Sequence, residues 1–142
     1  MRRFTQTAVL SLATAAALVG SVVVGSGPAM AASSPVAACG GGSYHVIDSH
    51  AIGGLATIYL LYNGSTNCVV TWKASKYQGK LSTTGASIQK QGGGRIDDTD
   101  FYKIYAGPVK VSAKGACVSW GGVASNGAGA GDSWQSGWTH CG

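Results

Sequence analysis

Charged residues are scarce in this sequence, and glutamate is absent altogether. Only 11% of the residues carry a formal charge, with ten Lys or Arg against five acidic residues, all of them Asp. Beyond the N-terminus the basic residues are spread singly from Lys73 to Lys114, whereas nucleic-acid binders gather them on one face or helix. The composition therefore argues against a nucleic-acid partner.

The motifs of common enzymes and metal sites are missing too. There is no Gly-x-Ser-x-Gly element of serine hydrolases and no Cys-x-x-Cys pair of zinc sites. The run Asp97–Asp100 offers oxygen ligands, but an EF-hand loop counted from Asp98 would place Lys103 at its obligatory glycine and also needs a Glu. We interpret the run as a solvated turn and expect no enzymatic activity, no metal and no cofactor.

Helical periodicity is absent from residues 32–142, and short alternating apolar runs separated by glycine predict strands instead. The strongest signal is a hairpin over 55–73, where β-branched and aromatic runs flank Asn63-Gly64, a pair that tolerates the positive φ of a tight turn. The pattern predicts an all-β fold, a small disulfide-stapled antiparallel sandwich or barrel of about seven strands. The other expected strands cover 44–50, 81–91 with an interruption at Gly85, 101–105, 109–113 and 117–120, while 32–38, 95–100 and 121–131 are expected to be leader, turn and loop.

The N-terminus has the pattern of a secretory signal. A basic start at Met1–Arg3 precedes an apolar run over 8–24, and Ala29–Ala31 has the small residues of a cleavage site. Serine and glycine inside the run make it poor for a membrane span, which needs ~20 apolar residues. We predict a signal peptide over 1–31 and a single secreted, extracellular domain over 32–142 that is not held in a membrane after cleavage.

Four cysteines follow the predicted cleavage site, and an even number in a secreted domain indicates two disulfides. Three connectivities are possible. We favour the pairs that close local loops, and by chain-entropy estimates each would stabilise the fold by roughly 3–4 kcal/mol. The favoured pairs are Cys39–Cys68 and Cys117–Cys141.

One stretch invites comparison with an active site. In a regular strand Asp48 and His50 share a face, roughly 7 Å apart along the chain, while His45 falls on the opposite face. His140 could join them in three dimensions, and such a set suits acid–base or metal chemistry. The alternative is that Asp48 caps or turns the chain and the histidines are surface residues.

Aromatic residues are the other candidates for binding, because exposed Trp and Tyr can stack on sugar rings or anchor an interface. Trp134 and Trp138 lie in a Gly/Ser-rich stretch with little to bury them, and Tyr102 lies on the predicted strand 101–105. Trp72 and Trp120 are expected in the core.

Several motifs together resemble one protein family. These are Cys-Gly-x-x-Ser-Tyr-His-Val-Ile-Asp-Ser-His, Thr-Ile-Tyr-Leu-Leu-Tyr-Asn, Asn-Cys-Val-Val-Thr, Tyr-Ala-Gly-Pro-Val, Ala-Lys-Gly-Ala-Cys-Val-Ser-Trp-Gly-Gly and His-Cys-Gly. In this order the chain resembles the small four-cysteine spore-associated proteins of filamentous actinobacteria. The resemblance covers essentially all of residues 32–142 and departs at 121–131 and Trp138. It implies export and association with spores or aerial growth, without an established enzymatic activity.

The sequence thus favours a secreted, non-catalytic structural or surface-associated protein linked to spores or aerial growth. One alternative is a module that binds wall polymer or glycan through Trp134 and Trp138. A second is an inhibitor of secreted proteases that presents loop 92–100 or 121–131. The expected partner is a spore or cell-wall polymer or another surface protein, and we expect a monomer.

Overall fold

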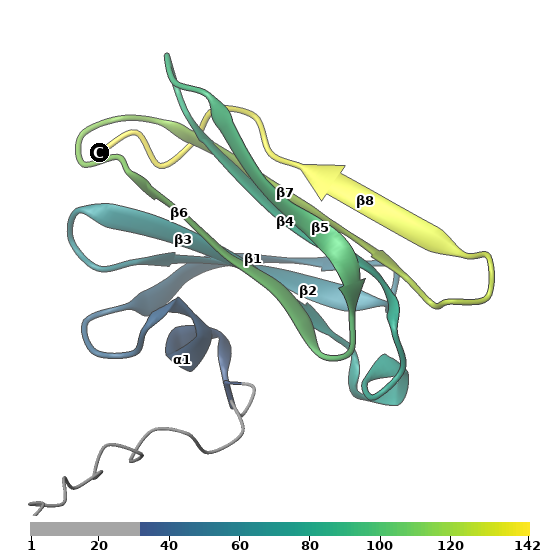
Figure 1. Cartoon of the computed structure of the whole chain (residues 1–142). Coiled ribbons are helices and arrows are strands. Elements are labelled where there is room, and N and C mark those ends of the chain that lie inside the picture. Colours follow the sequence, from purple (N-terminus) through teal and green to yellow (C-terminus); the bar gives the residue numbers. More distant parts are fainter. Residues whose placement is uncertain (1–31) are drawn as a thin grey trace, which may run out of the picture. The chain divides into compact units, whose positions relative to one another are not determined.

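Two antiparallel four-stranded sheets pack face to face (Figure 1). The computed structural model describes residues 32–142, and the predicted signal peptide over 1–31 lies outside the described residues. Sheet A has the strand order β1-β2-β3-β6 and sheet B the order β5-β4-β7-β8. The expected all-β fold is therefore confirmed, as a sandwich of eight strands. The strands are β1 (His45–Ile52), β2 (Ala56–Tyr62), β3 (Thr66–Lys73), β4 (Ser82–Lys90), β5 (Arg95–Tyr102), β6 (Tyr105–Ser112), β7 (Val118–Ser125) and β8 (Gly131–Gln135).

The hairpin predicted over 55–73 is β2 and β3, joined at Asn63-Gly64. Gly64 has a φ of 103°, and the Asn63 side-chain oxygen accepts hydrogen bonds from the backbone N–H groups of Ser65 and Thr66 at 3.1 and 2.8 Å. The side chain thus replaces backbone partners that the turn lacks. This local chemistry explains why the hairpin could be read from sequence.

The core lies between the sheets and is built by period-two alternation. Leu60 and Val69 enter it from sheet A, and Ile88 and Trp120 from sheet B, each at most 1% exposed. Burying one such side chain is worth about 1.5–3 kcal/mol. The expectation that Trp120 belongs to the core is confirmed.

A short helix, α1 (Pro35–Cys39), covers part of the outer face of sheet A. The Ser34 hydroxyl accepts from the Ala37 N–H at 3.1 Å at its start, and Gly40 ends it in the left-handed conformation. The expectation of a loose leader over 32–38 is wrong, because Cys39 is disulfide-bonded to β3 and holds the segment down. Among the described residues no helix has the length and hydrophobicity to cross a bilayer.

Both favoured disulfides, Cys39–Cys68 and Cys117–Cys141, are present. The second joins the residue before β7 to the segment that follows β8. Two backbone hydrogen bonds between Val118 and Thr139, at 2.8 and 3.0 Å, hold the same segment. The tail at 139–142 is thus attached by a covalent bond and by a short ladder.

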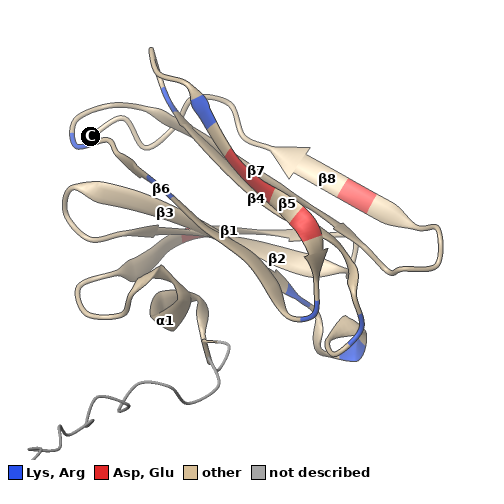
Figure 2. Cartoon of the chain, viewed as in Figure 1, with Lys and Arg blue, Asp and Glu red and all other residues tan. Residues whose placement is uncertain are grey.

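The prediction of a charged turn over 95–100 is wrong, because these residues form most of β5. This is an edge strand whose side chains are mostly exposed, so apolar alternation is weak; Figure 2 shows its acidic residues along the sheet edge. The Asp98 carboxylate accepts from the Gly107 N–H of β6 at 2.8 Å and from the Tyr102 hydroxyl at 2.5 Å. A carboxylate therefore joins the two sheets here. The predicted strand 101–105 is instead the junction of β5 and β6.

The loop expected over 121–131 is also mostly strand, and only 126–130 connects β7 to β8. A Cβ atom at Gly122 would collide with the Thr71 side chain and lie 2.7 Å from the Gly85 carbonyl oxygen. Gly85 likewise sits inside β4, under the side chains of Thr99 and Val123, and does not interrupt it. These glycines serve close packing between neighbours.

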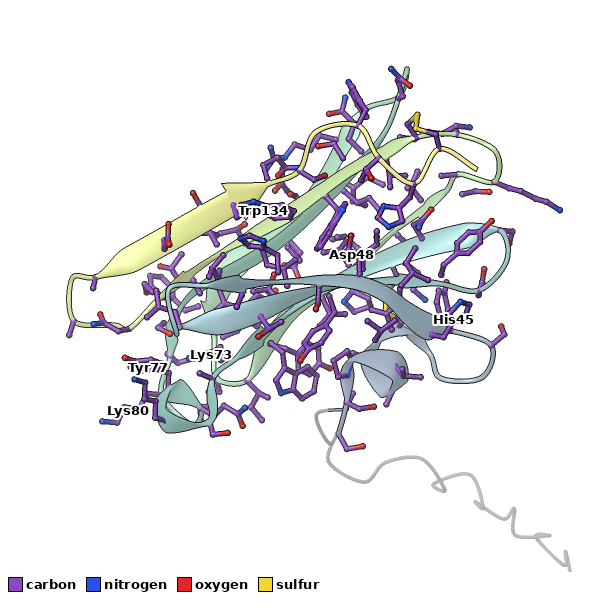
Figure 3. The ribbon with its side chains drawn as sticks, turned by 180° about the vertical axis from the view of Figure 1, so that it is seen from behind. His45, Asp48, Lys73, Tyr77, Lys80 and Trp134 are labelled. Atoms are coloured by element: carbon purple, nitrogen blue, oxygen red, sulfur yellow. A yellow bond between two sulfur atoms is a disulfide. The ribbon has the colours of Figure 1, made fainter. Side chains whose placement is uncertain are left out.

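Lys73 is a second polar link between the sheets. Its side chain is 1% exposed, and Nζ donates to the carbonyl oxygens of Lys80 at 2.7 Å and Tyr102 at 3.0 Å (Figure 3). Burial lowers the pKa of the Lys73 ammonium, because desolvation disfavours the charged form. A one-turn 3-10 helix, η2 (Ser75–Tyr77), lies between Lys73 and Lys80 along the chain.

Replacing Asp98 by Asn should lower the pKa of Tyr102. The hydrogen bond to the Asp98 carboxylate, followed by burial and nearby negative charge, raises the Tyr102 pKa from 10.0 to about 12. The contribution of the Asp98–Tyr102 hydrogen bond to the free energy of unfolding is therefore complete below pH 10 and is lost as pH rises to about 12. An absorbance titration of the tyrosines should show one group near 12 in the wild type and none in D98N. The variant D100N, on the same strand, should shift that group much less; equal shifts would contradict the assignment.

Candidate functional site

The outer face of sheet B carries two adjoining hollows. The larger, of about 700 Å³, lies beside the loop 126–130, and the smaller, of about 280 Å³, lies between β5 and β8. They share Val123 and Ser133, so they form one depression across the sheet. We call it the sheet B groove. Its outward-facing lining includes Leu81, Thr83, Gly85, Arg95, Asp97, Thr99, Phe101, Val123, Ser125, Ser133 and Gln135.

Glycine occupies the middle of β4, in the floor of the sheet B groove. Thr99 and Val123 lean over Gly85 from the two neighbouring strands, where a Cβ atom would collide with them. Beside this floor the Ser87 hydroxyl donates to the Gln135 side-chain oxygen at 2.9 Å. The Gln135 amide donates in turn to the Ser119 hydroxyl at 2.9 Å. This network fixes polar side chains of β4, β7 and β8 in place.

The two ends of the groove differ in chemistry. At one end the Arg95 guanidinium donates to both carboxylate oxygens of Asp97, at 2.7 and 3.2 Å. At the other end Phe101 and Leu81 are 65% and 61% exposed, although both are large and apolar. Hydroxyl, amide and guanidinium groups next to an exposed ring suit a ligand that has many hydroxyls and also apolar faces.

Trp134, predicted to be exposed, points inward from β8 instead (Figure 3). Its ring stacks on His50 of β1 with centroids 3.9 Å apart and an interplanar angle of 9°. The edge of Trp120 meets it from the core at 4.9 Å. The expectation that little buries Trp134 is therefore wrong, because partners distant in sequence cover both sides of its ring.

Asp48 and His50 share a face of β1, as expected, but turn to different partners. His50 contacts Trp134, whereas the Asp48 carboxylate lies 3.5 Å from Nε2 of His140 in the tail. His45 lies apart, with Nδ1 3.5 Å from the Ser43 carbonyl oxygen. His140 thus meets Asp48, as the sequence suggested, while the full set does not converge. Within 32–142 no cluster of three or more His, Cys, Asp or Glu could hold a metal ion.

The remaining aromatic candidates divide in the same way. Trp138 is 46% exposed, as predicted. Tyr102 is half-buried and its hydroxyl is committed to Asp98. Trp72, expected in the core, lies half-buried on the outer face of sheet A, stacked on Tyr105 with centroids 4.8 Å apart. The core expectation for Trp72 is wrong because its neighbours Val70 and Cys68 point to that same outer face.

Sequence reasoning missed the groove residues on β5. Thr99 and Phe101 alternate with Asp98 and Asp100, so a strand over the whole of 95–102 would have placed them on one face. The available signal was this alternation, which the acidic composition of the run obscured. Ser133 and Gln135 gave no comparable signal, because they lie on a strand of five residues.

A comparison with curated proteins identifies a relative. The chain is 40% identical over 111 residues to spore-associated protein A of Streptomyces coelicolor, across 77% of this chain and 71% of that protein. The chain belongs to the spore-associated protein A family. This membership confirms the resemblance seen in the sequence. No protein-family model and no solved structure matches this spore-associated protein A homologue.

In this family member, Trp134→Ala and Trp138→Ala should differ sharply in stability. Trp134 contacts the core and His50, so its truncation should lower the free energy of unfolding by about 3 kcal/mol. Trp138→Ala removes an exposed ring and should change it by no more than about 0.5 kcal/mol. Urea unfolding followed by far-ultraviolet dichroism measures both. Similar losses in the two variants would contradict the inward placement of Trp134.

Proposed function

We propose that this protein is an exported, non-catalytic component of the spore surface that binds neutral wall polysaccharide in the sheet B groove. The observation that carries the proposal is the groove itself, in which hydroxyl and amide side chains lead to an exposed Phe101. Sugar rings present hydroxyls at their edges and C–H groups on their faces, so both kinds of lining have a counterpart.

Export and spore association rest on three observations. The relative at 40% identity carries the name spore-associated protein A. The N-terminal pattern up to Ala31 is that of a signal peptide. All four cysteines are paired in disulfides, which persist outside the cytosol.

The proposal of a non-catalytic role is supported by what the ionisable side chains do. Asp98 holds Tyr102 and Gly107, and Lys73 donates to two backbone carbonyls. Arg95 and Asp97 neutralise one another at one end of the groove. These contacts maintain the fold, so the groups are engaged in structure.

The charged side chains around the sheet B groove favour a neutral wall polymer over an anionic one. The charged residues that line the sheet B groove are Arg95, Asp97 and Asp132, and Arg95 is paired. Figure 2 shows acidic residues on β5 and β8 and basic residues mainly near strand ends and turns. An anionic polymer would meet unfavourable charge along this face. We therefore favour a neutral polysaccharide.

Protease inhibition has less support as an alternative. It required a protruding loop at 92–100 or 121–131, but most of both segments is paired in β5, β7 and β8. The short loop 126–130 is held by hydrogen bonds from its own backbone to the Asn126 side chain, at 2.7 and 3.1 Å. It lies beside the groove and forms part of its lining.

The test is sedimentation of the purified, oxidised protein with spore walls, peptidoglycan, chitin and cellulose. Phe101→Ser removes the exposed ring, and Ser133→Leu fills the point shared by the two hollows. Each should weaken binding about tenfold, equivalent to roughly 1.4 kcal/mol. Near-ultraviolet dichroism checks that the variants are folded.

Two matched controls remove exposed apolar side chains outside the groove. Trp138→Ser and Val46→Ser, at residues 46% and 44% exposed, should bind like the wild type. Loss of binding in Trp138→Ser with unchanged binding in Phe101→Ser would place recognition at the C-terminal tail and contradict the groove. Binding to none of the four polymers would contradict the polysaccharide proposal while leaving spore association through another protein.

A further inference from the structure

A second, separate cavity lies between the inner face of sheet A and the C-terminal tail, at residues 140–142. Its volume is about 320 Å³, and Ile47, Tyr62 and Ala113 contribute apolar walls. His140 and Cys141 of the tail form another wall. It shares no lining residue with the sheet B groove.

Asn67 is the polar group of this cavity. It lines the cavity, is 3% exposed and points between the sheets from β3, on the same side as Val69. Its side-chain amide has two donors and an acceptor. In the facing wall, Nδ1 of His140 is buried and has no hydrogen-bond partner within residues 32–142. Buried polar side chains are nearly always paired. A molecule that occupies the cavity would supply the partner that Nδ1 lacks and would also meet the Asn67 amide.

His140 fixes the tail side of the cavity. Its φ is 52°, and it is the one non-glycine residue of 32–142 in the left-handed region. Such a backbone persists where the surroundings determine it, and here Cys117–Cys141 and the Val118–Thr139 ladder do so. Asp48 lies 3.5 Å from Nε2 and orients the ring. These contacts thus hold the cavity wall formed by the tail in one position.

The size and lining of the cavity define the class of ligand. A dry cavity of about 150 Å³ accommodates benzene, and ligand pockets begin at about 300 Å³. We propose that this cavity binds a compact, neutral, mainly apolar molecule of one or two rings, whose single hydroxyl, carbonyl or amide pairs with Asn67. The proposal goes beyond polymer binding, because the ligand is a small diffusible molecule and occupies different residues.

Nuclear magnetic resonance of the oxidised, isotope-labelled protein tests the site with two probes of equal shape. 1-Naphthol carries one hydroxyl, and 1-methylnaphthalene carries a methyl group in its place. Both should shift the backbone signals of Ala113 and Gly115, and 1-naphthol should also shift the Asn67 side-chain amide. Asn67→Leu should weaken 1-naphthol binding about tenfold, the equivalent of one hydrogen bond, and leave 1-methylnaphthalene bound at least as well.

A second variant fills the space directly. Ala113→Leu should abolish binding of both probes, whereas Ala128→Leu, in the exposed loop 126–130, should leave it unchanged. Phe101→Ser should also bind both probes normally, which separates this site from the groove. Failure of the wild type to bind either probe, signals that shift only outside the cavity, or full binding by Ala113→Leu would each overturn the proposal.

Discussion

The stack of Trp134 on His50 is the contact through which the last strand joins the first. Because side chains alternate along a strand, an inward Trp134 forces Ser133 and Gln135 outward. Those two residues then line the sheet B groove, next to the floor at Gly85. The tail that follows β8 then places His140 next to Asp48. One aromatic contact therefore determines the orientation of β8 and, through it, the composition of both proposed sites.

The thin core also depends on polar links at its margins. Fourteen buried apolar residues form the core between the sheets, which in a domain of this size leaves a small net stability. Asp98 joins β5 to β6, and Lys73 joins the end of β3 to the Tyr102 carbonyl of β5 and to the Lys80 carbonyl just before β4. Each link satisfies groups whose burial without a partner would be costly. The two disulfides then restrict the unfolded chain at both ends of the domain.

Sequence predicted those features whose cause is local. The Asn63-Gly64 turn, the disulfide pairs and the all-β class follow from neighbouring residues and from spacing. It failed where the partner lies far along the chain: Trp134 is covered by His50, and Gly122 accommodates Thr71. The exposure of aromatic side chains was difficult to predict for the same reason. A Gly/Ser-rich context suggested exposure for Trp134, while the acidic context of Phe101 concealed a strand that presents its ring to solvent.

The shape of the second cavity depends on how the tail is held. Residues 140–142 form one wall of that cavity. They begin directly after Thr139, whose backbone is hydrogen-bonded to Val118. The ladder alone fixes the backbone up to Thr139, so the positions of His140 and Cys141 depend on the bond to Cys117. That bond persists under oxidising conditions and is lost in a reducing cytosol. The cavity wall is therefore complete only while the Cys117–Cys141 bond is intact.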